Sequence, residues 1–125
     1  VVFSPADVPG QAPAEWYYDV AWVREGRWIA VGDFGTILAS DDDGATWSCV
    51  VCDGAGENLY AVAFRGERGL AVGQHGAARL TLDGGVTWED AWTGLDACLG
   101  DALWLSDTEV LVAGEAGTVL RRTID

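Results

Sequence analysis

A repeat of 41 residues runs through most of the chain. The segment Ala-Val-Gly-Asp-Phe-Gly at residues 30–35 returns as Ala-Val-Gly-Gln-His-Gly at 71–76 and as Val-Ala-Gly-Glu-Ala-Gly at 112–117. The first glycines of the three copies, Gly32, Gly73 and Gly114, are therefore 41 residues apart each time. A fixed period of this length indicates one supersecondary unit that is repeated and stacked, so that neighbouring units bury a common core.

Each unit reads as four short strands. In the first unit, segments 18–23, 27–32, 35–40 and 46–51 are rich in Val, Ile, Trp, Leu and Thr, and residues typical of turns separate them. Several of these segments lack polar alternation, which indicates sheets covered on both faces. Four strands in about 40 residues are typical of a propeller blade. We therefore expect an all-β fold, a β-propeller made of three four-stranded blades of about 41 residues.

The domain organisation follows from the same period. We expect a single propeller module over residues 1–125, with repeats at approximately 16–56, 57–98 and 99–125. The third unit ends after its third strand, and residues 1–10 are the segment that we expect to supply the missing outer strand, in the same chain or in a neighbour. The first residue is Val and the sequence contains no Met, which indicates a processed or excised piece.

The charge balance excludes several classes of partner. The 125 residues include 20 acidic and 7 basic ones, all of them arginine, and the formal net charge is −13. A surface this acidic repels phosphate backbones, so we expect no nucleic-acid partner. No apolar stretch is long enough to cross a bilayer as a helix, so we expect no membrane span.

A second motif follows the first in two of the units. It places Ser or Thr, Asp, Gly and Thr-Trp at the same spacing, in Ser40, Asp42, Gly44, Thr46 and Trp47 and again in Thr81, Asp83, Gly85, Thr87 and Trp88. This motif resembles the Asp-box, or BNR repeat, of sialidase-type propellers. Together with the preceding Ala-Val-Gly element, each unit is most similar to the repeats of photosystem II stability and assembly factor-like propellers. The resemblance implies a bacterial or organellar protein, often extracytoplasmic, in a family many of whose members have no known catalysis.

The residues of the Asp-box also have a structural role that can be argued from their chemistry, independently of the family resemblance. The aspartates are expected to accept hydrogen bonds from turn amides, and the glycines to supply a positive φ. Trp47 and Trp88 offer large apolar surfaces that can wedge between blades. Calcium is disfavoured because the carboxylates do not alternate as in an EF-type loop, and no bidentate Glu closes the segment.

Catalytic chemistry finds little support in the sequence. A sialidase needs several arginines around one carboxylate, and the seven arginines form no constellation at repeat-equivalent positions. No pair of carboxylates stands out for glycoside hydrolysis among the 20 acids. His75 is the single histidine and lies in a turn, where it is more often a surface group than a ligand. We therefore expect no enzyme, no catalytic residue, no cofactor and no metal.

The three cysteines leave their pairing open. Cys49 and Cys52 lie on and just after an expected outer strand, where residues three apart are separated by roughly 10 Å, too far for a disulfide unless the strand turns there. A bridge between Cys52 and Cys98 in neighbouring loops is the alternative in an oxidising compartment. A zinc site would need Cys98 and His75 to converge on the same place.

The expected binding face lies opposite the Asp-boxes, where the turns between second and third strands meet the connections between blades. It is an acidic and aromatic set made of Asp33, Phe34, Asp53, Glu57, Gln74, His75, Trp92, Asp96 and Glu115. Such a surface suits a basic protein segment or a glycan, because aromatic faces stack on cations and on sugar rings. The turns of the three units carry different residues, which favours an asymmetric protein contact over identical sugar pockets.

These observations predict a non-catalytic binding or scaffolding propeller that mediates protein–protein interaction or complex assembly. The alternatives are a carbohydrate-binding, lectin-like propeller and a fragment of an Asp-box glycosidase. Three blades leave apolar edges uncovered, so we expect a homodimer in which two chains form six blades. The alternative is a piece of a longer propeller. The resemblance further implies an extracytoplasmic bacterial protein, periplasmic or secreted.

Overall fold

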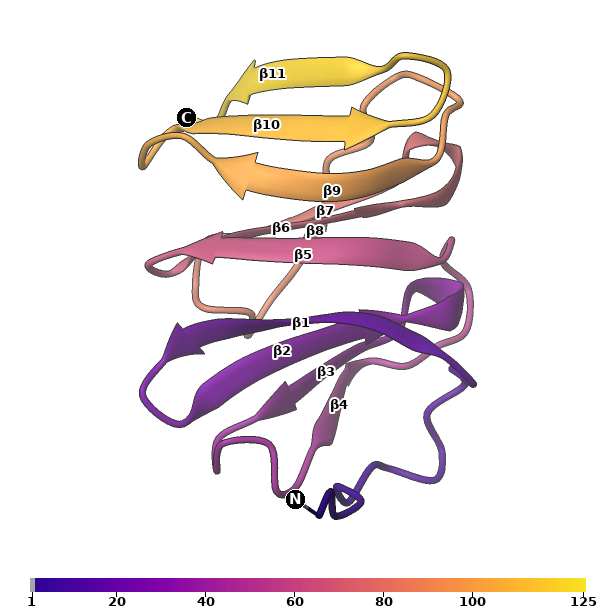
Figure 1. Ribbon diagram of the computed structural model, residues 1–125, viewed down its shortest axis with the longest axis vertical. Coiled ribbons are helices and arrows are strands. Elements are labelled where there is room, and N and C mark those ends of the chain that lie inside the picture. Colours follow the sequence, from indigo (N-terminus) through magenta and orange to yellow (C-terminus); the bar gives the residue numbers. More distant parts are fainter. Residues whose placement is uncertain (1) are drawn as a thin grey trace.

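The structure, a computed structural model, describes residues 2–125 and contains three antiparallel sheets (Figure 1). The first sheet is formed by β1 (Tyr17–Arg24), β2 (Arg27–Gly32), β3 (Ile37–Ser40) and β4 (Ser48–Val51). The second is formed by β5 (Leu59–Arg65), β6 (Arg68–Gly73), β7 (Ala78–Thr81) and β8 (Glu89–Asp90). The third is formed by β9 (Leu99–Trp104), β10 (Glu109–Gly114) and β11 (Val119–Thr123). The expected all-β class is confirmed, and the third sheet has three strands within the described residues, as expected for a unit that ends after its third strand.

Each sheet is a meander whose neighbouring strands are joined by short turns. β1 pairs with β2 so that Trp22 lies opposite Trp28, and the corresponding pairs in the other sheets are Phe64–Gly69 and Trp104–Val110. These pairs define structurally equivalent positions in the three sheets. Among residues 2–125 the structure contains no helix long and apolar enough to cross a membrane.

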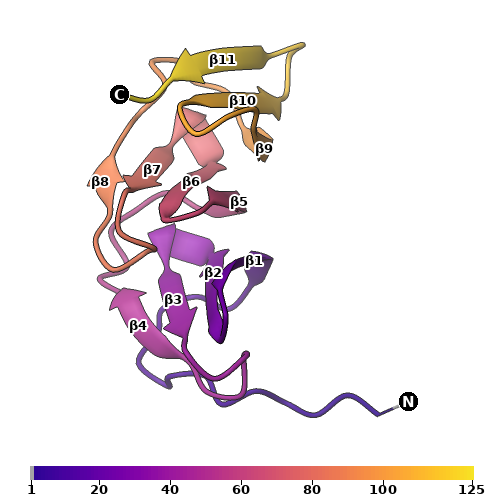
Figure 2. The same ribbon diagram turned by 90° about the vertical axis from the view of Figure 1, so that its left-hand side faces the viewer.

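The core lies between the sheets, which stack face to face in a curved fan with β1, β5 and β9 along its inner side (Figure 2). Between the first and second sheets, Ile29, Val31 and Ile37 pack against residues of β5 and β6. Between the second and third, Leu70, Val72 and Ala78 occupy the same positions 41 residues later. This regular burial explains the lack of polar alternation, because both faces of the middle sheet are covered.

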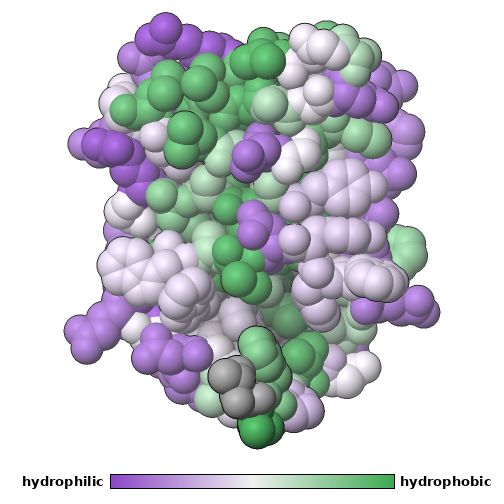
Figure 3. Space-filling model, viewed as in Figure 1, coloured by the Kyte–Doolittle hydropathy of each residue, from purple (hydrophilic) through white to green (hydrophobic). Residues whose placement is uncertain are grey.

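The two ends of the fan are open. Val20 and Trp22 on β1 are 55% and 56% exposed, and Leu103 on β9 and Val119 on β11 are 61% and 70% exposed. Figure 3 shows a hydrophobic patch over the third sheet, at the top of the molecule. We call the face of the first sheet that carries Val20 and Trp22 its leading face. The face of the third sheet that carries Leu103 and Val119 is its trailing face.

The N-terminal segment lies on the first sheet. The backbone N–H of Asp7 donates to the carbonyl of Ala45, and the Trp47 N–H donates back to the Asp7 carbonyl. This pairing is parallel and next to β4, at the opposite end of the fan from β11 (Figure 1). Within one chain, therefore, residues 2–10 do not complete the third sheet, and an exchange with a neighbouring chain stays a prediction. Val1, the first residue of the expected strand, lies outside the described residues.

A disulfide joins Cys49 and Cys52, whose Cα atoms are 5.8 Å apart. On an ideal strand, residues three apart would lie too far from each other for a disulfide, but β4 is irregular at this point. Opposite Val51 and Cys49 the pairing with β3 shifts by one residue, which is the mark of a bulge. Cys98 is half-buried and free, so the alternative bridge between Cys52 and Cys98 is not formed.

Candidate binding surface

The turns between the second and third strands present three equivalent side chains to solvent. The middle residues Phe34, His75 and Ala116 have φ values of 57°, 56° and 58°, in the left-handed region that glycine usually occupies. In each turn the preceding residue donates its N–H to a carbonyl of the loop before the sheet, at Trp16, Asn58 and Cys98. Each turn is therefore fixed by a backbone hydrogen bond to the preceding loop, while its middle side chain points to solvent. We call this end of the molecule the turn face.

Asp33 is a structural residue and not part of an exposed surface. It is buried, and its carboxylate accepts the backbone N–H groups of Glu15 and Trp16 and the hydroxyl of Tyr18 at 2.7 Å. Burial raises the pKa of this carboxyl, but the hydrogen bonds from Tyr18, Trp16 and Glu15 leave the pKa below its ordinary value. The prediction that Asp33 belongs to the binding face is wrong, because the segment before β1 folds over it.

His75 is the most distinctive group on the turn face. Its Nδ1 lies 2.8 Å from the Oδ1 of Asp96, and its backbone carbonyl accepts the indole N–H of Trp92 at 3.1 Å. The hydrogen bond to Asp96 and the nearby charges of Asp96, Glu57 and Glu115 raise the pKa of His75 above its ordinary value. Three acidic or aromatic residues of the expected set, Glu57, Trp92 and Asp96, are therefore gathered around one histidine.

A groove opens beside this cluster on the second sheet. It is lined by Glu57, Leu59, His75, Ala77, Arg79, Asp90 and Trp92. Trp92 is 58% exposed, although its indole N–H donates to the carbonyl of His75 in the turn. The wall thus combines two carboxylates, a fixed indole and one arginine. It can accept hydrogen-bond donors and stack on a flat or cationic group.

The other predicted residues of the turn face divide by role. Glu115 is exposed, but its Oε1 accepts the Cys98 N–H and closes its own loop. Asp53 holds a local turn through the N–H of Ala55 and lines a neighbouring groove together with Arg79. Phe34 is 49% exposed, and Gln74 is half-buried with its backbone N–H bonded to Asn58. The structure thus brings Glu57, His75, Trp92 and Asp96 together and leaves the rest at the margin.

The Asp-boxes lie at the other end of the sheets. Asp42 accepts the Thr46 N–H at 2.9 Å and also binds the hydroxyls of Ser40 and Thr46. These hydrogen bonds, those from Thr46 first, lower the pKa of Asp42 to about 2, and the matching set around Asp83 lowers its pKa to about 2. All the donors come from the box itself, so this carboxylate is engaged in holding its own turn.

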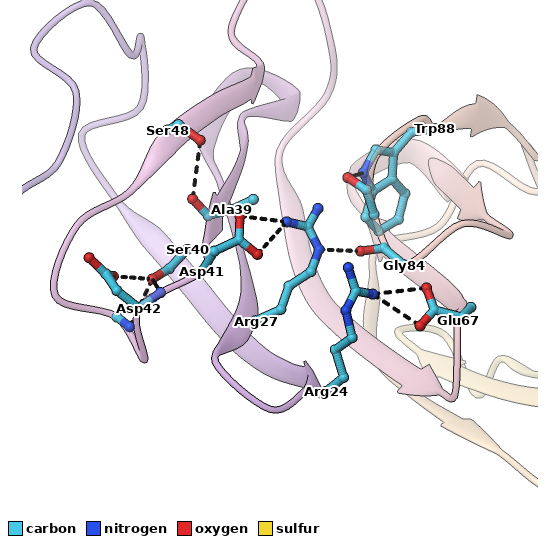
Figure 4. A network of polar contacts seen from close by, with 12 residues as sticks. Arg24, Arg27, Ala39, Ser40, Asp41, Asp42, Ser48, Glu67, Gly84 and Trp88 are labelled. Carbon is cyan, nitrogen blue, oxygen red and sulfur yellow. Dashed lines mark hydrogen bonds and ion pairs between the residues drawn. The ribbon is translucent and has the colours of Figure 1, made fainter.

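A chain of arginine contacts at this end links the sheets (Figure 4). Arg27 is buried, and its Nε donates to the carbonyl of Gly84 at 2.8 Å while its Nη1 pairs with Asp41. Its counterpart 41 residues later, Arg68, donates to the carbonyl of Ile124. The exposed pairs Arg24–Glu67 and Arg65–Asp107 repeat in the same way.

Sequence reasoning missed these contacts. It found no constellation of arginines at repeat-equivalent positions, although Arg24 and Arg65, like Arg27 and Arg68, are separated by the repeat length. The period was the signal that could have identified them. Their role is structural, because each one joins a sheet to the following sheet and none reaches the turn face.

Solved structures give the fold an identity. The chain superposes with a TM-score of 0.77 and 23% identity on a structure described as YCF48 bound to D1 peptide, over 91% of this chain and 38% of that one. It also superposes on an ancestral GH74 enzyme with a TM-score of 0.65 and 13% identity, over 87% of this chain and 17% of the enzyme. The three sheets are blades of a β-propeller. The chain thus spans well under half the length of either propeller. No protein-family model and no curated protein matches it.

The blade assignment gives each predicted element its place. The turn face lies where the connections between blades run, and the two Asp-boxes lie at the far end, as the strand order requires. Trp88 packs at the junction of the first and second blades, edge-to-face against Phe64 with 6.0 Å between ring centroids. Trp47 is half-buried on the first blade, and no other blade packs against that face within residues 2–125.

Proposed function

We propose that this chain is a non-catalytic, protein-binding propeller module whose turn face holds an extended basic segment of a partner protein. The observation that carries the proposal is the groove on the second blade, where Glu57, Asp90 and the exposed Trp92 line the same space. Carboxylates attract Lys and Arg side chains, and an indole face binds their cationic ends.

Electrostatics supports a cationic partner. The pKa of His75 is raised by Asp96, Glu57 and Glu115, so a proton at this place is stabilised by three surrounding acids. The same field attracts other positive groups, and the net charge of −13 extends the attraction beyond the groove. Arg79 is the single arginine in the groove wall, and it can orient a backbone carbonyl of the bound segment.

The comparison with a peptide-bound propeller supports the class of partner. The structure with a TM-score of 0.77 is described as a complex of YCF48 with a D1 peptide, so a propeller of this fold binds a peptide. An assembly role for this chain rests on that likeness together with the turn face. The GH74 enzyme shares the fold at 13% identity, and the glycosidase alternative is a competing outcome of the tests.

Location outside the cytoplasm is part of the proposal. The Cys49–Cys52 disulfide supports it, because disulfides persist in oxidising compartments and are rare in the cytosol. A periplasmic or secreted module would meet exposed segments of membrane or secreted proteins. Labelling the cysteines of the native protein in a cell extract, with and without reductant, measures whether this bridge is formed.

The test is a titration of a fluorescently labelled peptide, followed by the fluorescence anisotropy of the label, so that a variant without Trp92 can be measured in the same way. A flexible peptide of alternating Lys and Ser should bind, whereas a peptide in which Glu replaces Lys should not. Trp92→Ala and Glu57→Lys should each weaken binding at least tenfold. Glu25→Lys is the matched control, because it makes the same charge change in the hairpin between β1 and β2, at the opposite end.

Two outcomes would overturn the proposal. Equal binding by the wild-type protein and by both turn-face variants would place the interaction elsewhere on the molecule. Binding of neutral oligosaccharides in a glycan array, or their hydrolysis, without any binding of the basic peptide would instead support the lectin or glycosidase alternative.

A further inference from the structure

A second surface, away from the turn face, lies on the outer edge of the middle blade. β4 and β8 are the last strands of the first and second blades, and both run along the outer side of the fan (Figure 2). Each of these strands directly follows an Asp-box. The second blade is packed between the other two, so its outer edge is not one of the two open ends of the fan.

The first blade shows what can pair with the backbone beside an Asp-box. Asp7 of the N-terminal segment forms a parallel bridge with Thr46. The Asp7 N–H donates to the carbonyl of Ala45 at 3.0 Å, and the Trp47 N–H donates to the Asp7 carbonyl at 2.9 Å. We call this carbonyl and this N–H of the blade its box edge. One residue of an extended segment is enough to satisfy both groups.

The second blade presents the same box edge, formed by the Val86 carbonyl and the Trp88 N–H. Its Asp-box has the same internal geometry, because the Thr87 N–H donates to Asp83 at 2.9 Å, the distance found in the first blade. Among residues 2–125, however, neither the Val86 carbonyl nor the Trp88 N–H takes part in a hydrogen bond. Unpaired backbone groups at a strand edge are a template for the addition of an extended segment.

The alternation of side chains along a strand indicates what an added segment would contact. Two residues paired in a bridge place their side chains on one face, and their neighbours lie on the other face. The neighbours of Asp7 therefore share a face with Ala45 and Trp47. In the second blade the corresponding residues are Val86, which is 58% exposed, and Trp88, which is half-buried. An added segment would thus meet two apolar side chains on this face.

We propose that the box edge of the second blade is a strand-addition site for an extended segment of a partner protein that has apolar residues at alternate positions. The segment runs parallel to the box strand, as residues 6–8 do in the first blade. Its central residue donates to the Val86 carbonyl and accepts the Trp88 N–H, and the apolar residues on either side of it cover Val86 and Trp88. Neither residue lines the turn-face groove, so this site is separate from the proposed function.

The probe is the end-blocked peptide Ser-Pro-Val-Ser-Val-Pro-Gly, which is residues 4–10 of the chain with Val in place of Ala6 and Ser in place of Asp7. It carries no charged side chain, so the net charge of −13 cannot attract it. Two backbone hydrogen bonds give a weak complex, so binding is followed by the NMR shifts of backbone amides. The Trp88 amide should shift in a saturable way. The Trp47 amide should not, because it already donates to Asp7.

Two altered peptides test the two kinds of contact. N-methylation of the central Ser removes the N–H that would donate to the Val86 carbonyl, and it should weaken binding at least tenfold. Replacing both Val residues of the peptide with Ser should also weaken binding at least tenfold, because no apolar side chain would then cover Val86.

Protein variants locate the site. Val86→Asp places a charge at the box edge and should weaken the probe at least tenfold, and because Val86 is exposed the variant should fold. Val119→Asp makes the same change at an exposed valine of the third blade, and this matched control should bind normally. Asp7→Pro removes the N–H that donates to Ala45, so the probe should then shift the Trp47 amide as well.

Four results would overturn the inference. The first is the lack of a saturable shift of the Trp88 amide, and the second is equal binding of the probe and its N-methylated form. The third is normal binding by Val86→Asp. The fourth is a Trp88 shift that grows with protein concentration without peptide, since a second copy would then occupy the edge. Glu57→Lys should bind this probe unchanged, which separates the result from any failure of the turn-face proposal.

Discussion

The Nε of Arg27 donates a hydrogen bond to the carbonyl oxygen of Gly84, 57 residues away in the next blade. The same guanidinium pairs with Asp41 in its own blade, so one buried side chain joins two Asp-box turns. Arg68 makes the corresponding contact with Ile124. The blades are therefore held together by buried polar contacts at this end as well as by their apolar faces.

Arg27→Ala should destabilise the fold by about 1.5–3 kcal/mol, the range for hydrogen bonds that involve a charged group. Arg24→Ala should cost less than about 1 kcal/mol, because the pair with Glu67 is exposed and screened by solvent. Urea unfolding followed by tryptophan fluorescence measures both. Equal effects of the two substitutions would contradict the distinction between a buried and an exposed contact.

Trp88→Ala should destabilise by roughly 3–5 kcal/mol, as expected for removal of a large aromatic side chain from a packed junction. Trp47→Ala should cost clearly less, because within residues 2–125 no second blade packs against Trp47. Thermal unfolding of the two variants under identical conditions makes the comparison. A larger loss at Trp47 would show that a partner covers the leading face of the first blade.

Acid should weaken both Asp-boxes. The folded-state pKa values of Asp42 and Asp83 are lowered from 3.8 to about 2, so the stability that these groups contribute is fully present above pH about 4. It is lost as the pH falls from about 4 to about 2. Asp42→Asn with Asp83→Asn should flatten the pH dependence of the urea midpoint in this window. An unchanged slope would show that other carboxylates dominate.

The open apolar faces should join two chains. The leading face carries Val20 and Trp22, and the trailing face carries Leu103 and Val119, all more than half exposed. At the junction of the second and third blades, the indole N–H of Trp104 donates to the carbonyl of Ala63. Trp22 of the first blade is equivalent to Trp104, and Leu103 of the third blade is equivalent to Ala63. Light scattering should therefore give twice the mass of the chain. Trp22→Asp should give a monomer.

A monodisperse monomer of the wild-type chain with a cooperative melt would exclude this six-bladed ring. Aggregation would instead support a piece of a longer propeller, whose other blades cover the two faces.

The architecture could be predicted from the sequence because the same pattern of strands and turns occurs in three copies. The spacing of Gly32, Gly73 and Gly114 located equivalent turns, and the Asp-boxes located the opposite end. The apolar runs around Ile29 and Leu70 then identified the core.

What the sequence did not predict depends on local deviations from the repeat. The bulge in β4 brings Cys49 to Cys52, and no composition signal marks a bulge. Asp33 is buried because its carboxylate accepts two N–H groups of the segment before β1 and the hydroxyl of Tyr18, whereas Glu115 in the third blade accepts the Cys98 N–H and stays exposed. The contacts of Arg27 cross between blades, so they depend on the packing angle of two sheets.

The candidate surface was predicted in outline. The strand order placed Glu57, Trp92 and Asp96 on one face with His75. The groove and the bond from Trp92 to the His75 carbonyl required the actual conformation of the loop after β8.

The most direct test of the account is to locate a bound basic segment. A Lys- and Ser-containing peptide with a photoreactive side chain is cross-linked to the wild-type protein, and the modified residues are identified by mass spectrometry. Turn-face binding predicts cross-links within residues 53–59, 74–79 and 90–96, and their loss in Glu57→Lys. Cross-links concentrated at the Asp-boxes, residues 40–47 and 81–88, would contradict the account.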